Sequence, residues 1–391
     1  MNRLGAKRKK VVLMTFGDPA TDPRPNRMIK LFHSLGYIVD ILCPTCSGTL
    51  PIGTHFQISK MHGARLRYPS ILLNLLTKIF KSETDFISEQ IPYCDFNWVS
   101  LAASADYEFL IVEDLQLLPG AMALKGAGNI IFDAREYYPL QNEENFWWQL
   151  FERPDRIRLC KRFLNEVDLF LTVSPGLSKA YNRNFGVQAQ LFRSTPHVIE
   201  LIPRVTNSSK IKLVHHGVAN KNRHLQKMIE LMGFLDSRFE LDMYLTGDSR
   251  YINTLLKVSD NYDTVKICAP IPYDELIKRL NEYDIGIFYN EPTTFNLRHS
   301  LPNKIFEFIQ ARLAVAIAPS PDMKELIENF GCGIVASGFT VVEMAHALNA
   351  LSANQIDQMK ANSQKAAKVL NFDVEKEILI ERLNAMIEGK K

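Results

Sequence analysis

Residues 300–308, with the sequence SLPNKIFEF, carry the combination of side chains that says most about chemistry. Pro302 and Asn303 are typical of a helix start, and Lys304 and Glu307 stand three positions apart, which places both on one face of that helix. A cation beside a carboxylate at the start of a helix can hold a phosphate and a ribose together. An ion pair on the protein surface has the same local pattern, so the surrounding segments must decide between the two.

Two other segments of the second half place glycine beside charged residues at the end of a predicted strand. The segment HHGVANKNR follows one strand and precedes a helix, so Lys221 and Arg223 are candidates to meet a phosphate close to Gly217. Gly247 and Asp248 belong to a turn after the next strand, where the backbone can approach a ligand closely. An ordinary tight turn is the alternative for this second segment.

The first half contains a polar loop, FGDPATDPRPNR, that follows a predicted strand and opens a helix. The loop includes Asp22, Arg24 and Arg27. Because backbone amides at a helix N-terminus bind anions and polar ligands, these side chains are candidates for a binding edge. The loop lacks the GxGxxG spacing of a dinucleotide site. Helix capping and surface charge are the alternative roles of these three residues.

Carboxylates also follow two buried strands of the first half. Glu113 and Asp114 come after one strand, and Asp133, Arg135 and Glu136 stand at the end of the next. Acidic residues at strand ends are candidates for hydroxyl recognition or base catalysis, and they are also common helix N-caps. Because both groups follow strands of one predicted sheet, together they favour a site at one edge of that sheet.

Other signatures of catalysis or metal binding are weak. Cys43 and Cys46 form a CxxC after a strand, but no second CxxC and no histidine pair completes a zinc site. The nine histidines form no HExxH, and the sequence contains neither GxSxG nor a Walker A motif. The CxxC is therefore a poor candidate for a redox or zinc role.

Alternating apolar runs and helical patterns supply the elements that position these candidates. In the first half we expect strands at residues 11–16, 38–42, 109–112, 129–133 and 169–173, and a helix at residues 27–35 that Gly36 closes. In the second half we expect strands at residues 211–215, 239–245, 264–268, 285–288 and 315–318, and helices at residues 225–235, 273–281 and 303–310. Strands bounded by helices at this spacing predict parallel, doubly wound α/β sheets.

The length of 391 residues favours two domains, because one core rarely grows beyond roughly 250–300 residues. The polar stretch at residues 204–210 is the best candidate for a linker. We therefore predict two Rossmann-like domains, at residues 1–203 and 204–391, with the last helix packing back on the first domain. Ligands of such sheets bind at the carboxyl ends of the strands, so two such edges that face each other across a cleft suit a reaction of two substrates.

Composition narrows the class of protein. Hydrophobic residues make up 46% and charged residues 23%, and a net charge of +3 is too weak to predict nucleic acid as a partner. The sequence has no run of about 18 apolar residues, so we expect no membrane-spanning helix. The apolar run after the basic N-terminus is too short for a signal peptide. Six scattered cysteines favour reduced thiols and a cytoplasmic protein. Residues 65–81 flank apolar side chains with cations, which fits a helix on the inner face of an anionic membrane or a buried helix with solvated ends.

The order of these segments resembles glycosyltransferase family 4, with the GT-B fold, over nearly the whole chain. Residues 302–308 (PNKIFEF) resemble the family's P-N-K-x-F-E-Y donor helix, which is the most specific of the matching motifs. Asp22-Pro-Arg24 resembles the first loop of the family. FDARE at residues 132–136 resembles the D-x-H-E strand end, and TVSP at residues 172–175 is similar to the T-V-S strand end.

The resemblance implies retaining transfer of a sugar from a nucleotide diphosphate donor, usually without a metal ion. It implies that Arg223 and Lys304 face the diphosphate and that Glu307 faces the donor ribose. Two cations at a leaving diphosphate stabilise the charge that develops as the glycosidic bond breaks, so we expect neither a metal nor another cofactor. The other donor-side candidates are Gly217, Lys221, Gly247, Asp248, His299, Leu301, Pro302 and Asn303. The candidates for the acceptor side are Asp22, Arg24, Arg27, Glu113, Asp114, Asp133, Arg135 and Glu136.

Three positions depart from the family pattern. His299 stands where the first of two glutamates eight positions apart is usual, and Arg312 stands where a glycine is usual after the donor helix. Arg135 replaces the histidine of D-x-H-E; an arginine can donate hydrogen bonds there but cannot act as a general base.

The sequence thus predicts a hexosyltransferase that moves a sugar from a nucleotide sugar to a glycan or lipid-linked acceptor, in cell-surface polysaccharide biosynthesis. The acceptor half of this prediction rests on residues 65–81, as a peripheral membrane contact, and on the resemblance. Two alternatives stay open: a GT-B nucleotide-sugar epimerase, and a GT-B protein that binds sugar nucleotides or partners without turnover.

Overall fold

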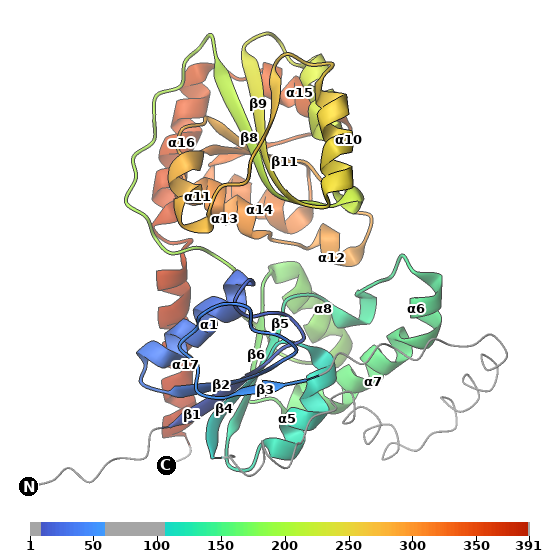
Figure 1. The fold of residues 1–391 in the computed structure, drawn as a ribbon, viewed down its shortest axis with the longest axis vertical. Coiled ribbons are helices and arrows are strands. Elements are labelled where there is room, and N and C mark those ends of the chain that lie inside the picture. Colours follow the sequence, from blue (N-terminus) through green and yellow to red (C-terminus); the bar gives the residue numbers. More distant parts are fainter. Residues whose placement is uncertain (1–8, 59–105, 390–391) are drawn as a thin grey trace, which may run out of the picture. The chain divides into compact units, whose positions relative to one another are not determined.

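A computed structural model describes residues 9–58 and 106–389 and divides the chain into two α/β units (Figure 1). The first unit comprises Met1–Val173, Leu177–Phe192 and Leu383–Lys391, and the second comprises Ser174–Gly176 and Arg193–Arg382. Each unit is built around its own parallel sheet. The predicted fold class, two Rossmann-like parallel-sheet domains, is confirmed. A cleft between the domains stays a prediction.

The sheet of the first unit has the strand order β3-β2-β1-β4-β5-β6-β7, and all paired strands run parallel. The order reverses between β1 and β4, so the carboxyl ends of these two strands flank the place where such sheets bind ligands. The strands are β1 Lys10–Met14, β2 Ile38–Cys43, β3 His55–Gln57, β4 Tyr107–Val112, β5 Asn129–Ala134, β6 Leu169–Thr172 and β7 Gln190–Leu191. The helices are α1 Pro23–Ser34, α5 Leu118–Leu124, α6 Phe146–Phe151, α7 Arg153–Phe163 and α8 Pro175–Phe185.

Helix α1 begins four residues earlier than the sequence predicts. The Asp22 side chain accepts a hydrogen bond from the backbone N–H of Arg24 at 3.1 Å, and Pro23 occupies the first helical position. An N-cap followed by a proline is a strong start signal, and it outweighs the apolar periodicity that begins only at Arg27. The predicted loop is therefore shorter, and Arg24 and Arg27 project from the helix.

The sheet of the second unit has the order β10-β9-β8-β11-β12-β13, again with parallel pairs throughout. The order reverses between β8 and β11. The strands are β8 Ile211–Ala219, β9 Phe239–Gly247, β10 Val265–Cys268, β11 Ile285–Phe288, β12 Ala314–Ile317 and β13 Gly333–Val335. The helices are α9 Gln226–Leu231, α10 Ser249–Ser259, α11 Tyr273–Leu280, α12 Phe295–Arg298, α13 Asn303–Gln310, α14 Pro321–Phe330, α15 Val341–Asn349, α16 Ala353–Ala367 and α17 Phe372–Glu388.

Helices cover both faces of this second sheet, with α10 and α15 on one side and α11, α13 and α16 on the other (Figure 1). Successive strand residues therefore enter different cores: Leu213 packs in one apolar cluster and Val214 in the other. This two-sided burial explains why the strands appear in the sequence as continuous apolar runs. The edge strands β3, β7 and β13 were not predicted, because they have only two or three residues.

Two local differences from the predicted elements bear on the candidate site. Strand β8 continues to Ala219, beyond the predicted end at residue 215, so Gly217 lies inside a strand. Arg312, where the resembled family has glycine, has a φ of 65°, a left-handed conformation that favours glycine. Its guanidinium donates to the backbone carbonyls of Gln310 at 2.6 Å and Ile199 at 2.7 Å, which offsets the strain.

None of the helices within the described residues combines the length and apolar character needed to cross a membrane. The basic N-terminal tail and residues 65–81, which carry the predicted membrane contact, lie outside the described residues.

Candidate functional site

Gly217 and Lys304 meet at the carboxyl edge of the second sheet, beside the reversal between β8 and β11. Gly217 has a φ of 122°, and a Cβ at this position would lie 2.6 Å from Lys304 Nζ. Only glycine leaves room for the ammonium group there. Lys304 belongs to the first turn of α13, and its Nζ lies 5.8 Å from the ring centroid of Phe288 at the end of β11. The amine is thus held between the ends of the two strands.

Two cations at this edge, the buried Lys304 and the half-buried Arg223, lack enough opposite charge. Burial, followed by the nearby charge of Arg223, lowers the pKa of Lys304 to about 8, while Glu307 acts in the opposite direction. Burial also lowers the pKa of Arg223, which ends the short helix Lys221–Arg223 after β8. Both shifts disfavour positive charge in the unliganded protein. An anion bound between the two cations would remove that penalty, and a diphosphate is such an anion.

Glu307 lies beside His216, a residue to which the sequence analysis gave no role. His216 Nε2 is 3.3 Å from Glu307 Oε2, both side chains are buried, and the imidazole packs edge-on against Phe308 with ring centroids 5.4 Å apart. Burial, then the charges of Lys304 and His215, hold the pKa of His216 well below its usual range. A neutral imidazole therefore faces the carboxylate. The one signal in the sequence is the pair of adjacent histidines near the end of a strand.

Residues 301–303 prepare the start of α13. Leu301 is buried in the apolar cluster beneath the helix, Pro302 is its N-cap, and Asn303 is its first residue. These positions set the direction from which the helix presents Lys304, as their types predict.

The turn after β9 has a clear structural role. Gly247 ends the strand with a φ of 103°, and the Asp248 carboxylate accepts a hydrogen bond from the backbone N–H of Arg250 at 2.9 Å, which caps α10. Lys221 is exposed at the start of its short helix. For Asp248 the cap accounts for the residue without a ligand, so it is the weakest of the donor-side candidates.

His299 has a partner that the sequence analysis missed. Its Nδ1 lies 2.6 Å from Oδ2 of Asp322, a buried residue in the first turn of α14, and its ring packs on Phe295 with centroids 4.5 Å apart. His299 directly follows α12, and Asp322 follows the carboxyl end of β12. Both residues thus stand at the same edge of the second sheet as Lys304, and Asp322 fixes the orientation of the imidazole.

In the first unit, Arg24 and Asp133 form a buried ion pair. Arg24 Nε and Nη2 donate to the two carboxylate oxygens at 2.7 and 2.6 Å, and the guanidinium carbon lies 4.8 Å from the ring centroid of Phe192. The pair joins α1 to the end of β5. Both carboxylate oxygens of Asp133 are engaged, which favours a positioning role for Asp133, whereas Arg24 Nη1 has no hydrogen-bond partner within the described residues.

Arg135 connects two further acceptor-side candidates. Its Nη1 donates to Asp22, and its Nη2 lies 3.6 Å from Glu113 Oε2. Glu113 is fully buried at the end of β4, and within the described part of the chain neither of its carboxylate oxygens has a hydrogen-bond partner. Burial raises its pKa to about 8, against the lowering effect of Arg135 and with a further rise from Asp133. A buried carboxyl of this kind is mostly protonated at neutral pH.

The remaining candidates of the first unit surround the same strand ends. Asp114 accepts a hydrogen bond from the backbone N–H of Phe16 at 2.7 Å and so links the end of β4 to the loop after β1. Burial raises the pKa of Glu136 to about 7, although Gln141 Nε2 donates to it at 2.6 Å. Arg27 is buried on α1. The fold therefore gathers these candidates around the carboxyl ends of β1, β4 and β5, as the sequence predicts.

The CxxC is not arranged for reactivity. Cys43 is buried at the end of β2, and burial raises the pKa of its thiol to about 12, opposite to the shift of a reactive thiolate. Across residues 9–58 and 106–389, no three histidine, cysteine or acidic side chains are grouped to hold a metal ion.

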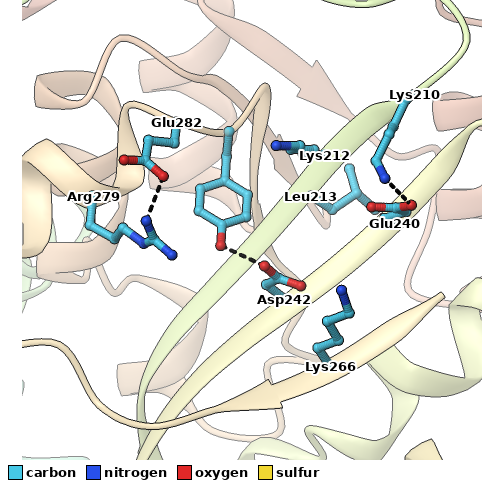
Figure 2. A pocket seen from close by; sticks show the side chains of 9 residues that line it. Lys210, Lys212, Leu213, Glu240, Asp242, Lys266, Arg279 and Glu282 are labelled. Carbon is cyan, nitrogen blue, oxygen red and sulfur yellow. Dashed lines mark hydrogen bonds and ion pairs between the residues drawn. The ribbon is translucent and has the colours of Figure 1, made fainter. Parts of the chain in front are cut away.

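A cavity of about 180 Å³ opens on another part of the second unit, near the amino ends of β8, β9 and β10 (Figure 2). Its walls are mostly charged and partly neutralise one another: Lys210 pairs with Glu240 at 2.7 Å, and Arg279 pairs with Glu282 at 2.6 Å. The cavity lies at the opposite end of the strands from Lys304. The cations that lack enough opposite charge, Lys304 and Arg223, lie at the carboxyl edge and not at this cavity.

The sequence matches no family model and no curated protein. Solved structures match nearly the full length. Sucrose-phosphate synthase from Thermosynechococcus elongatus has a TM-score of 0.71 at 11% identity, over 98% of this chain and 100% of that one. Anabaena HepE in complex with UDP and glucose has a TM-score of 0.68 at 10% identity, over 97% and 100%. WaaG, a glycosyltransferase involved in lipopolysaccharide biosynthesis, has a TM-score of 0.65 at 12% identity, over 94% and 98%.

These likenesses show the fold. The protein has the GT-B architecture of these glycosyltransferase structures, which confirms the fold that the resemblance predicted. Membership of family 4 stays a prediction.

Proposed function

We propose that the protein is a glycosyltransferase that moves a sugar from a nucleotide diphosphate donor to a glycan or lipid-linked acceptor. The observation that carries the proposal is the placement of the buried Lys304 and the half-buried Arg223 near Glu307 at the reversal of the second sheet. Buried charge at this position is costly unless a ligand compensates it. The likeness to Anabaena HepE in complex with UDP and glucose supports a nucleotide sugar as that ligand.

The chemical role of the two cations follows from the bond that breaks. As the sugar leaves, negative charge builds up on the diphosphate, and fixed positive groups in a buried site stabilise this charge more strongly than water does. Gly217 allows Lys304 to reach that position. Because two cations supply this stabilisation, we expect turnover to persist when metal ions are chelated.

Glu307 would bind the ribose hydroxyls, with the neutral imidazole of His216 beside its carboxylate. This role and a retaining course of reaction come from the resemblance to family 4. Support from the structure is the position of Glu307, one turn after Lys304 on the same helix.

For the acceptor, we propose a glycan or lipid-linked molecule of cell-surface polysaccharide biosynthesis, bound at the carboxyl edge of the first unit. The likeness to WaaG, described as involved in lipopolysaccharide biosynthesis, supports this class. Residues 65–81 would make peripheral contact with the inner face of the membrane from the cytoplasm. Their apolar stretch flanked by basic side chains is the support for this contact.

The test is release of nucleoside diphosphate from UDP-, GDP- and dTDP-sugars with and without a lipid-linked glycan extract as acceptor. A transferase releases diphosphate only when acceptor is present. Conversion of one donor sugar into another without acceptor would instead show an epimerase, and binding without any turnover would show a non-catalytic protein. Lys304→Met should abolish release, whereas Lys257→Met, on the exposed face of α10, should leave it unchanged.

A further inference from the structure

Asn290, two residues beyond the end of β11, is buried with its side-chain oxygen unpaired. The side chain is only 6% exposed, and within the described residues its Oδ1 has no hydrogen-bond partner. Buried polar atoms almost always have a partner, because an unpaired one costs free energy. An unpaired buried acceptor beside a candidate binding site therefore indicates a contact that a ligand completes.

The two residues before Asn290 show on which side of the sheet its side chain lies. Phe288 packs in the apolar cluster that contains the core side of α13, and its ring centroid lies 5.8 Å from Lys304 Nζ. Tyr289 packs in the cluster on the opposite face of the sheet. Because side chains alternate along an extended chain, Asn290 returns to the side of Phe288. The unpaired oxygen thus belongs to the part of the carboxyl edge where Lys304 stands.

Both chain neighbours of Asn290 are anchored. The Tyr289 hydroxyl donates a hydrogen bond to the backbone carbonyl of Phe339, and the Glu291 carboxylate pairs with Lys227 of α9 at 3.0 Å. Helix α9 follows β8, so this ion pair joins the segments after the two strands at the reversal of the sheet. The Asn290 amide is therefore held in place before a ligand arrives, which lowers the entropic cost of the contact.

An unpaired oxygen selects a ligand group that donates a hydrogen bond. The ionised oxygens of a diphosphate only accept hydrogen bonds, so the partner must be another part of a nucleotide sugar. The proposed function gives the ribose hydroxyls to Glu307, which stands beside His216 of β8, whereas Asn290 stands at the end of β11. The base is attached to the ribose, on the side away from the diphosphate. The hydroxyls of the transferred sugar are the donors that remain.

We propose that Asn290 is a specificity residue of the donor site, and that its Oδ1 accepts a hydrogen bond from a hydroxyl of the sugar that is transferred. This inference rests on the proposed function, because it requires a nucleotide sugar beside Lys304. Loss of the Asn290 amide should weaken the binding of a nucleotide sugar and spare that of a nucleoside diphosphate. The free protein should lose no stability, because the oxygen has no partner there to lose.

The experiment is isothermal titration of the full-length protein with UDP, GDP and dTDP and with UDP-glucose, GDP-mannose and dTDP-glucose. For the pair that binds best, Asn290→Ala should bind the nucleotide sugar roughly three- to tenfold more weakly than the wild type and the nucleoside diphosphate equally well. Among analogues of that nucleotide sugar that each lack one sugar hydroxyl, one should bind the variant and the wild type with equal affinity. Asn253→Ala, the same exchange at an exposed position of α10, is the matched control and should bind every ligand like the wild type.

The unfolding temperature of Asn290→Ala should equal or exceed that of the wild type; a lower one would show that the oxygen has a partner in the free protein and would contradict the inference. Wild-type affinity of Asn290→Ala for the nucleotide sugar would overturn it. Equal losses for the nucleotide sugar and the nucleoside diphosphate would place the amide on the nucleotide and would overturn it as well. A wild type that binds none of the six ligands would remove the proposed donor site itself, and this inference with it.

Discussion

Binding of a nucleoside diphosphate should be linked to a proton on Lys304. In the unliganded protein its pKa is about 8, because burial and the charge of Arg223 oppose protonation. A diphosphate beside the amine should restore the pKa to at least its usual value near 10.5. The free protein must then take up a proton on binding whenever the pH is above about 8. Affinity is therefore highest below that pH and falls as the pH rises through it.

The size of the effect follows from the two pKa values. Between pH 7 and pH 9 the protonated fraction of free Lys304 falls from about nine-tenths to about one-tenth, so the dissociation constant should rise roughly tenfold. At pH 8 each ligand should bring about half a proton with it. The ligand itself contributes little, because the terminal phosphate ionises near pH 6.

The assay is isothermal titration of whichever of UDP, GDP and dTDP binds best, at pH 7, 8 and 9, in buffers with different heats of ionisation. The control is Lys304→Arg, because a guanidinium stays charged across this range. That variant should lose the pH dependence even if its affinity is lower. A wild-type affinity that is flat from pH 7 to pH 9, or a slope that survives in Lys304→Arg, would refute the linkage to this amine.

Three further predictions concern single side chains. Arg223→Ala and Glu307→Ala should each lower turnover about tenfold or more while leaving the fold intact, since a charge-assisted contact with a ligand is lost; full activity of both on a verified donor would remove the donor-site assignment. Gly217→Ala should weaken nucleotide binding about tenfold in titration, because the new Cβ displaces the ammonium of Lys304; an unchanged affinity would show that the amine does not need this space. Glu113 has a raised pKa in the folded protein, so its protonated carboxyl contributes fully to the free energy of unfolding below about pH 4.5. This contribution is lost as the pH rises through about 8. Urea unfolding should therefore find Glu113→Gln more stable than wild type at pH 9 and close to it at pH 4, and equal stability at both pH values would contradict the burial argument.

Most of the fold could be predicted from the sequence because the strands are buried on both faces. A short continuous apolar run such as residues 285–288 predicts a strand that is buried on both faces, and β11 occupies those residues. Where the signal is local chemistry rather than periodicity, prediction was less accurate. The start of α1 is set by Asp22 and Pro23, and the last residues of β8 continue through Gly217, which periodicity alone does not indicate.

Within the candidate site, the sequence predicts contacts only between residues that are close together in the chain. Lys304 and Glu307 are three residues apart, so helix geometry alone places them together. Their partners come from other strands and loops: His216 approaches Glu307 from β8, and Asp322 approaches His299 from the start of α14. Such long-range contacts depend on the strand order, which the sequence does not reveal.

The sequence also did not predict which side chains at the strand ends are buried. Glu113 and Asp114 are neighbours after one strand, yet Glu113 is fully buried while Asp114 binds the loop after β1. Sequence reasoning treats the two carboxylates alike. Only their surroundings separate a carboxyl with a raised pKa from one that links two loops.

The placement of the donor nucleotide is tested most directly by a crystal structure of the protein with the nucleoside diphosphate that binds it best. The diphosphate should lie at the carboxyl edge of the second sheet, with its oxygens within hydrogen-bond distance of Lys304 Nζ and the Arg223 guanidinium, and with the ribose beside Glu307. A nucleotide seated only on the first unit, or in the cavity near the amino ends of β8 and β9, would contradict it.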